Sequence, residues 1–290
     1  MELVLDAHAE IGESPIWNPD SSELLWVDIL AGLVHRFRPS DKSNATVGVG
    51  QPVGAVALTQ DERLLLAVRD GFALLDADGA VQMLAEVEAD NEQSRMNDGA
   101  CDAQGRYWAG TTQADRAAGS GSLYRLQATG DVQREVANLT LPNGIDWSPD
   151  GRSMYFIDSA TNCVDAFAFD GETGRVSDRR RLVEIPSEAG MPDGLTVDAE
   201  GCLWIAMYRG GALRRYSPAG ELDRIVELPV SLVTSCTFGD TDLGTLYITT
   251  ATRGLDSEAL LAQPGAGGLF RLRPGVTGLP AHRFGVTPRP

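Results

Sequence analysis

The chain has 290 residues, of which 43% are hydrophobic and 22% charged, a composition typical of a folded globular protein with a large core. Its 24 basic and 41 acidic side chains give a formal net charge of −17, which repels nucleic acid and anionic membrane surfaces. Neither is therefore expected as a partner, and no apolar run approaches the roughly 18–20 residues that span a bilayer.

The N-terminal segment MELVLDAHAEIGESP carries acidic residues early and has no basic region followed by an apolar core, so no signal peptide is expected. The cysteines are scattered without a C-x-x-C pair, which indicates small buried thiols in a reducing compartment and predicts a cytoplasmic protein. The histidines lie too far apart in sequence to favour a His-rich zinc site or a Ser-His-Asp triad. These residues are Cys101, Cys163, Cys202, Cys236, His8, His35 and His282.

Six similar segments follow one another along the chain at a spacing of roughly 40–50 residues. Each begins with an apolar strand that ends at a turn, and these turns fall at Ser21, Glu62, Gly105, Gly151, Gly201 and Gly244. A second strand follows each turn: LLWVDI, RLLLAV, RYWAGT, SMYFID, CLWIAM and TLYITT. A third, shorter strand comes next: LVHRFRP, FALLD, SLYRL, CVDAFAFD, ALRRYSP and GLFRLRP.

Three or four antiparallel strands per repeat are typical of propeller blades, because one blade cannot bury both of its faces alone. A β-sandwich does not explain the long period, and no strand–helix alternation supports an α/β fold. The segment DSEALLAQ (256–263) is the one short helix expected. The sequence therefore predicts an all-β protein, a single six-bladed β-propeller over residues 1–290, with monomer as the default state.

The position eight residues before each turn carries an oxygen donor in four of the six repeats. In chain order these positions are Glu13, Gly54, Asn97, Asn143, Asp193 and Cys236. Because the innermost strand of every blade lines the central channel, equivalent positions surround one axis. Carboxylate and amide oxygens without a His or thiolate pair favour Ca²⁺, Mg²⁺ or Mn²⁺, with Zn²⁺ and Fe²⁺ as alternatives. Few protein ligands leave open positions for water or substrate, as metal catalysis requires.

Two alternatives apply to these residues. Asn-Gly and Asp-Gly pairs are ordinary turn formers in which glycine takes a positive φ, so each pair alone has a structural explanation. Glu13 has no turn role at the same register, and a buried carboxylate near others must be paired or metal-bound. Arg95, two residues before Asn97, is expected either to hold an oxygen-rich ligand or to form a salt bridge between blades.

Several motifs along the whole chain resemble, in order, those of gluconolactonases, regucalcin (senescence marker protein) and related sugar lactonases. They are GESPIW, SRMNDG, PNGIDWSPDGRSMYFIDS, PDGLTVDAEGCLWIA, SCTFGDTDLGTLYITTA and GGLFRL. The resemblance implies a six-bladed propeller with one divalent metal ion at the mouth of the channel.

Matched motif by motif, the resemblance implies Glu13, Asn143 and Asp193 as metal ligands, with Asp193 also acting as the general base. Arg95 and Asn97 would contact the lactone and its hydroxyl groups, and Asp98 would support their loop. The tail PGVTGLPAHRF is expected to belong to the closing blade.

The chain departs from some of these relatives before its G-S-L-Y step, where they place a glutamate or a larger polar residue that reaches the substrate. Here the segment reads QADRAAGSGSLY, with Ala117 and Ala118 in that region, so an exact substrate preference does not carry over. The expected reaction is hydrolysis of a sugar aldonolactone to the aldonic acid. A metal-dependent phosphotriesterase or aryl-esterase, a calcium-binding regulatory protein and an interaction scaffold remain the alternatives.

Overall fold

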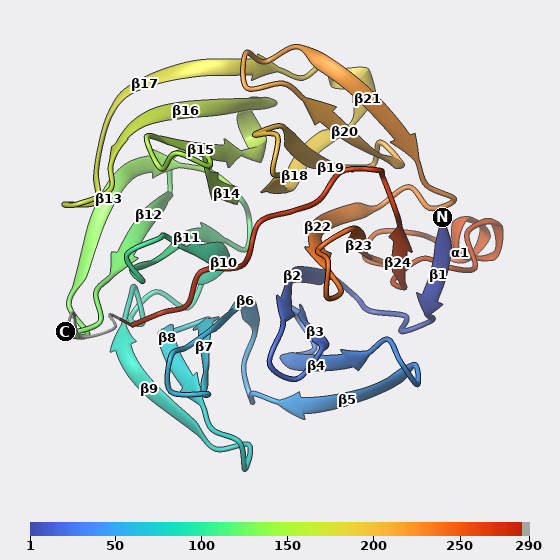
Figure 1. Ribbon diagram of the computed structural model, residues 1–290. Coiled ribbons are helices and arrows are strands. Elements are labelled where there is room, and N and C mark those ends of the chain that lie inside the picture. Colours follow the sequence, from blue (N-terminus) through green and yellow to red (C-terminus); the bar gives the residue numbers. More distant parts are fainter. Residues whose placement is uncertain (286–290) are drawn as a thin grey trace.

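Each segment of the sequence repeat folds into one four-stranded antiparallel sheet, and six such sheets surround a central channel (Figure 1). The structure is a computed structural model that describes residues 1–285. It confirms the predicted six-bladed β-propeller. The sheets are numbered here as blades one to six from the one that begins with strand β2.

The strands of each blade follow one another from the channel outward. The innermost strands are β2 (Gly12–Asn18), β6 (Val53–Leu58), β10 (Ser94–Cys101), β14 (Pro142–Trp147), β18 (Met191–Val197) and β22 (Val233–Gly239). The second strands are β3 (Glu23–Asp28), β7 (Leu64–Val68), β11 (Tyr107–Gln113), β15 (Ser153–Asp158), β19 (Leu203–Tyr208) and β23 (Thr245–Thr250).

The third strands are β4 (Leu33–Arg38), β8 (Gly71–Leu75), β12 (Gly121–Leu126), β16 (Cys163–Asp170), β20 (Ala212–Tyr216) and β24 (Leu269–Leu272). The outermost strands are β5 (Ser43–Gly48), β9 (Val81–Glu86), β13 (Val132–Leu139), β17 (Arg175–Glu184), β21 (Leu222–Glu227) and, in blade six, β1 (Glu2–Leu5). The first three strands of each blade match the three predicted per repeat.

The hydrophobic core lies between neighbouring blades, because each sheet covers the face of the next. Every residue of β3 and β7 is buried, whereas β5 at the rim is half-buried or exposed throughout. Leu25 and Val27 of blade one, for example, share a cluster with Val56 and Leu66 of blade two. The aromatic and aliphatic runs of the second strands therefore fill the spaces between the sheets.

Blade six is built from both ends of the described chain. Strand β1 pairs antiparallel with β24, with Glu2 opposite Arg271, and completes the sheet of β22, β23 and β24. The Thr234 hydroxyl donates a 2.5 Å hydrogen bond to the Gly12 carbonyl, which joins the inner strands of blades six and one. The ring is closed by these contacts between distant parts of the sequence.

The prediction that the tail PGVTGLPAHRF belongs to the closing blade is wrong. Strand β24 ends at Leu272, and the chain then crosses one face of the propeller as an extended segment (Figure 1). The Ala199 N–H donates to the Thr277 carbonyl at 2.9 Å in blade five, and the Gly285 N–H to the Gly105 carbonyl at 3.0 Å in blade three. The segment thus covers the face formed by the inner turns.

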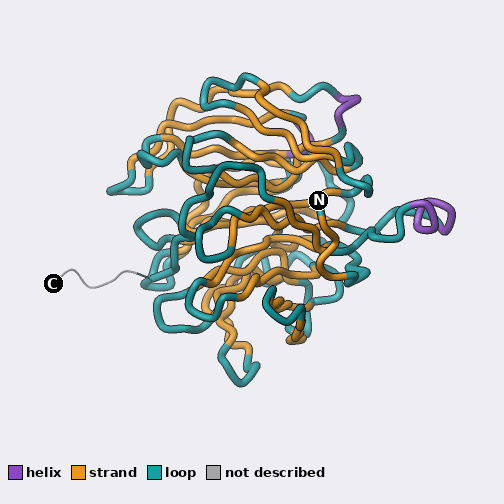
Figure 2. Tube along the Cα trace, turned by 45° about the vertical axis from the view of Figure 1, so that its right-hand side comes forward, coloured by secondary structure: helices purple, strands orange, loops and turns teal. Residues whose placement is uncertain are grey.

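The predicted helix is confirmed as α1 (Ser257–Ala262), with the Asp256 side chain accepting a 2.9 Å hydrogen bond from the Ala259 N–H as its N-cap. It stands away from the sheets on a loop between β23 and β24 (Figure 2). Two short 3₁₀ helices, η1 (Ser159–Thr161) and η2 (Ser187–Ala189), follow β15 and β17. No helix within residues 1–285 is long and apolar enough to cross a membrane.

Candidate metal and substrate site

A β-bulge interrupts the innermost strand of every blade: Asn97, Asn143 and Asp193 lie within bulges, and Glu13 borders one. The pairing shifts between Glu13 and Ile16 in β2, between Met96 and Gly99 in β10, and between Pro192 and Leu195 in β18. A bulge leaves one residue outside the ladder and redirects its side chain. The sequence repeat therefore repeats a bulge, which turns the polar side chains toward the channel mouth.

The Asx-Gly pairs in these bulges are not turns. Gly144 and Gly194 do not take a positive φ, in contrast to Gly151 and Gly201 of the inner turns. A Cβ on Gly144 would lie 2.6 Å from the backbone nitrogen of Leu195 in the next blade. Glycine is required here because adjacent inner strands approach closely.

All five candidate side chains line one cavity at the mouth of the channel. They are Glu13, Arg95, Asn97, Asn143 and Asp193. Two further positions of the same repeat register, Gly54 and Cys236, contribute nothing to it: the first has no side chain, and the second places its sulfur 3.8 Å from the Trp204 carbonyl.

The candidate oxygen donors are spread around the channel. Asn143 and Asp193 lie on neighbouring blades, four and five, so they are side by side. Glu13, on blade one, faces them from the other side of the channel. The three oxygen donors therefore approach the cavity from two sides.

A chain of hydrogen bonds connects the candidate residues across three blades. An Arg95 guanidinium N–H donates to Asn97 Oδ1 at 2.7 Å, and Asn97 Nδ2 donates to Asn143 Oδ1 at 2.7 Å. Asn143 Nδ2 in turn donates to Ser159 Oγ at 2.7 Å. The Ser159 hydroxyl donates to the Pro192 carbonyl at 2.6 Å, next to Asp193. This chain fixes which atom of Asn143 faces the cavity, because its NH₂ group is directed away.

The two carboxylates have far fewer partners. Glu13 Oε2 accepts a 2.7 Å hydrogen bond from the Ser14 N–H, while Asp193 accepts none from the described residues. Glu13 is 4% exposed and Asp193 8% exposed. Burial raises the pKa of both carboxyl groups well above their usual range, and the Asp193 charge adds to the effect on Glu13. Uncompensated carboxylates in such a place favour a bound cation.

Two more carboxyl groups lie below the cavity. Asp98, expected to support the loop, accepts a 2.8 Å hydrogen bond from the Gly99 N–H, and Asp146 accepts one of 2.8 Å from the Val197 N–H of the next blade. Burial raises the pKa of each to about 6. Asp98 also acts electrostatically on Glu13 and Asp193, so the negative charge extends from the mouth into the channel.

Sequence reasoning missed several residues of the cavity wall. Arg116, Met191, Tyr208 and Arg253 line it, and Ser159 orients Asn143 from behind. The sequence indicated Ser159 only weakly, through its position directly after the second strand of blade four, β15. Arg116 and Arg253 lie on loops whose lengths differ between blades, so the repeat does not align them, whereas Met191 begins β18 and Tyr208 ends β19.

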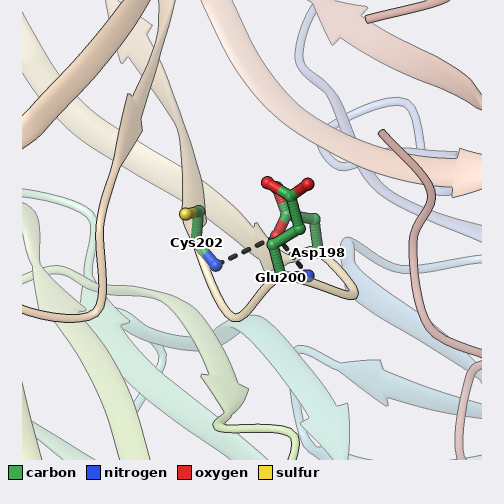
Figure 3. Close-up of side chains that lie close together, drawn as sticks. All are labelled: Asp198, Glu200 and Cys202. Carbon is green, nitrogen blue, oxygen red and sulfur yellow. Dashed lines mark hydrogen bonds between the residues drawn. The ribbon is translucent and has the colours of Figure 1, made fainter. Parts of the chain in front are cut away.

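A second acidic cluster, formed by Asp198, Glu200 and Cys202, lies on the β18–β19 turn (Figure 3). The Asp198 carboxylate accepts hydrogen bonds from the Glu200 and Cys202 N–H groups, both at 3.0 Å, and from the Trp204 indole at 2.9 Å. The Arg215 guanidinium adds a fourth donor at 2.8 Å and also pairs with Glu200. Because its acceptors are satisfied and its charge is paired, this cluster does not fit a metal ion.

Comparison with known proteins places this geometry in a family. Residues 11–252 match the model of the SMP-30/Gluconolactonase/LRE-like region. Regucalcin from Sus scrofa is 40% identical over 98% of both chains. The structure of a calcium-binding protein, regucalcin, from Agrobacterium tumefaciens superimposes with a TM-score of 0.95 at 30% identity, covering 98% of this chain and 97% of that one. A luciferin-regenerating enzyme superimposes with a TM-score of 0.90 at 30% identity, covering 96% of each chain.

Proposed function

The chain belongs to the SMP-30/Gluconolactonase/LRE-like family, as its motifs indicated, and we propose that it is a divalent-metal-dependent hydrolase of sugar aldonolactones. The observation that carries this proposal is the pair of buried carboxylates, Glu13 and Asp193, which converge with Asn143 on one cavity. Asp193 accepts no hydrogen bond from the described residues, so a bound cation would stabilise its negative charge.

The donor set fits a hard divalent ion. One oxygen of Glu13 accepts no hydrogen bond, both oxygens of Asp193 are available, and Asn143 Oδ1 retains one of its two lone pairs. Three oxygen ligands leave open coordination positions, which suits Ca²⁺, Mg²⁺ or Mn²⁺, with Zn²⁺ and Fe²⁺ as alternatives. The Agrobacterium relative is described as a calcium-binding protein, which makes Ca²⁺ the first ion to test.

The reaction opens the cyclic ester. A divalent ion held by Glu13, Asn143 and Asp193 would polarise the lactone carbonyl and stabilise the developing oxyanion. Asp193 accepts a proton from the attacking water through the oxygen that is not used as a ligand. The water oxygen adds to the carbonyl carbon, the bond from that carbon to the ring oxygen breaks, and the ring oxygen takes up the proton. The product is the open-chain aldonic acid.

Arg95 and Asn97 have different tasks in this proposal. Arg95 uses one nitrogen for Asn97 Oδ1 and the Met96 carbonyl, so its other N–H groups are available to sugar hydroxyls in the cavity. Asn97 uses its NH₂ group for the Pro142 carbonyl and Asn143. We therefore assign Arg95 to substrate orientation and Asn97 mainly to positioning Asn143.

A calcium-binding regulatory role is the second candidate, supported by the same oxygen donors and by the names of the regucalcin relatives. It requires tight metal binding but no turnover. One experiment separates the two.

The experiment measures lactone hydrolysis by proton release in weak buffer, after chelation and with Ca²⁺, Mg²⁺, Mn²⁺ or Zn²⁺ added back. The substrates are glucono-, galactono-, xylono- and arabinonolactone, each against its spontaneous blank. Metal-restored turnover that disappears in Asp193→Ala supports the hydrolase. Metal binding by calorimetry without turnover of any lactone rejects it in favour of the binding protein.

A further inference from the structure

The metal and substrate cavity opens into a larger hollow on its outer side, called here the vestibule. The vestibule shares Arg116, Met191, Tyr208 and Arg253 with the inner cavity. Arg209 and Glu188 also line it.

The vestibule is basic although the protein is strongly acidic. The whole chain carries 24 basic and 41 acidic side chains, yet three arginines line the vestibule, Arg116, Arg209 and Arg253, and Arg95 lines the adjoining inner cavity. Arg253 is paired with Glu10. Within residues 1–285, neither Arg116 nor Arg209 forms an ion pair with a carboxylate. Among the described residues, these two guanidinium groups therefore have no carboxylate partner at the entrance.

Electrostatic effects among these groups indicate that they converge. Burial and the positive charges of Arg116 and Arg253 together lower the pKa of Arg95 to about 10. Arg116 also opposes the effect of burial on Asp193. The Arg209 guanidinium lies 6.0 Å from the ring centre of Tyr208, whose hydroxyl donates to the Arg253 carbonyl at 3.1 Å.

Resting on the proposed lactonase activity, we propose that the substrate is an acidic lactone, with a carboxylate or phosphate group remote from the lactone carbonyl held by Arg116 and Arg209. Guanidinium groups bind both anions through paired, charge-assisted hydrogen bonds. A net charge of −17 repels such a substrate at long range, so local unpaired arginines are needed to bind it. A neutral sugar lactone needs neither of them.

The test compares matched substrates on the metal-loaded enzyme. D-glucono-1,5-lactone is the neutral probe, its 6-phosphate is the phosphate arm, and D-glucaro-1,4-lactone is the carboxylate arm. We expect kcat/KM for at least one anionic lactone to exceed that for the neutral lactone about tenfold or more, and the ratio to fall as KCl is raised. The arm with the larger ratio identifies the anionic group.

The Arg116→Gln/Arg209→Gln double variant should lower this ratio at least tenfold. Arg180→Gln, an exposed arginine on outer strand β17, makes half the charge change far from the mouth and should leave the ratio as it is. A ratio near one in the wild type, or an unchanged ratio in the double variant, overturns the inference while lactone turnover itself still supports the hydrolase.

A binding measurement keeps the two proposals separate. Calorimetry compares 6-phospho-D-gluconate and D-glucarate with D-gluconate on the wild type and the double variant. If no lactone is hydrolysed, the hydrolase proposal fails, and tighter binding of the doubly acidic sugars that depends on the two arginines still supports an anionic ligand. Equal binding of all three sugars overturns the inference.

Discussion

Asp193 and Asp198 lie five residues apart on one hairpin, and both are buried carboxylates, yet their surroundings are opposite. Asp193 at the channel mouth accepts no hydrogen bond from the described residues, whereas Asp198 at the inner turn accepts four, one of them from Arg215. The turn of blade three repeats the second arrangement, with Asp102 bound to Arg106 and Trp108. Burial of a charged group therefore indicates a ligand site only where its partners are missing.

Neutralising Asp193 is expected to have the largest effect on activity. Asp193→Asn should reduce kcat by about 10²–10⁴-fold, because the group that accepts the proton is lost. The thermal stability of the metal-free protein should not fall, since burial disfavours the charged carboxylate. Turnover and thermal unfolding measured on the same sample check both parts. Near wild-type turnover would remove Asp193 from the mechanism.

The same kind of change at Asp198 should act on stability instead. Asp198→Ala leaves Arg215 and the Trp204 indole without their buried acceptor and should lower the free energy of unfolding by about 3–5 kcal/mol. Turnover per folded molecule should be retained. Urea titration measures the loss, with exposed Asp131→Ala as the control that should show little change. A catalytic defect in folded Asp198→Ala protein would contradict the conclusion that Asp198 stabilises the fold while Asp193 serves the site.

Asn97 tests whether the hydrogen-bond chain positions the donors at the mouth. Asn97→Ala removes the donor to Asn143 Oδ1 and should weaken metal binding about 10–100-fold, as the loss of an outer-shell partner does. Most of kcat should return at saturating metal. Calorimetry and metal titration of activity provide the two readouts. A kcat that stays low at saturating metal would assign Asn97 to direct substrate contact instead.

The smallest effect concerns pH. The pKa values of Glu13 and Asp193 are raised in the folded, metal-free protein, so it binds protons more tightly than the unfolded chain and loses stability as pH rises. Asp98 and Asp146, with pKa values of about 6, act in the same direction. A cation that displaces these protons should therefore raise Tm more at pH 7.5 than at pH 5. The Glu13→Gln/Asp193→Asn variant should lose most of this difference, and a metal effect that is equal at both pH values would contradict the assignment.

The sequence alone predicted the blades because each repeat contains an apolar strand, a turn and an aromatic strand in the same order. It also predicted which polar side chains share the cavity, since the bulge recurs at one register. It could not place Arg116, Arg209 or Arg253, because these arginines lie on loops that the repeat does not align. The path of residues 273–285 was missed for a related reason: it depends on contacts with turns of distant blades, such as Gly105, and no local pattern encodes them.

The pairing of β1 with β24 has a consequence for how this chain reaches its fold. Residues 2–5 have no sheet to join until residues 269–272 have been synthesised, so β1 can be paired only after the strands between them have been made. Until then β24 presents an open edge, the kind of strand that pairs with other chains. The ring therefore closes only when β1 pairs with β24, and loss of β1 would leave the β24 edge of each molecule free to pair with other chains.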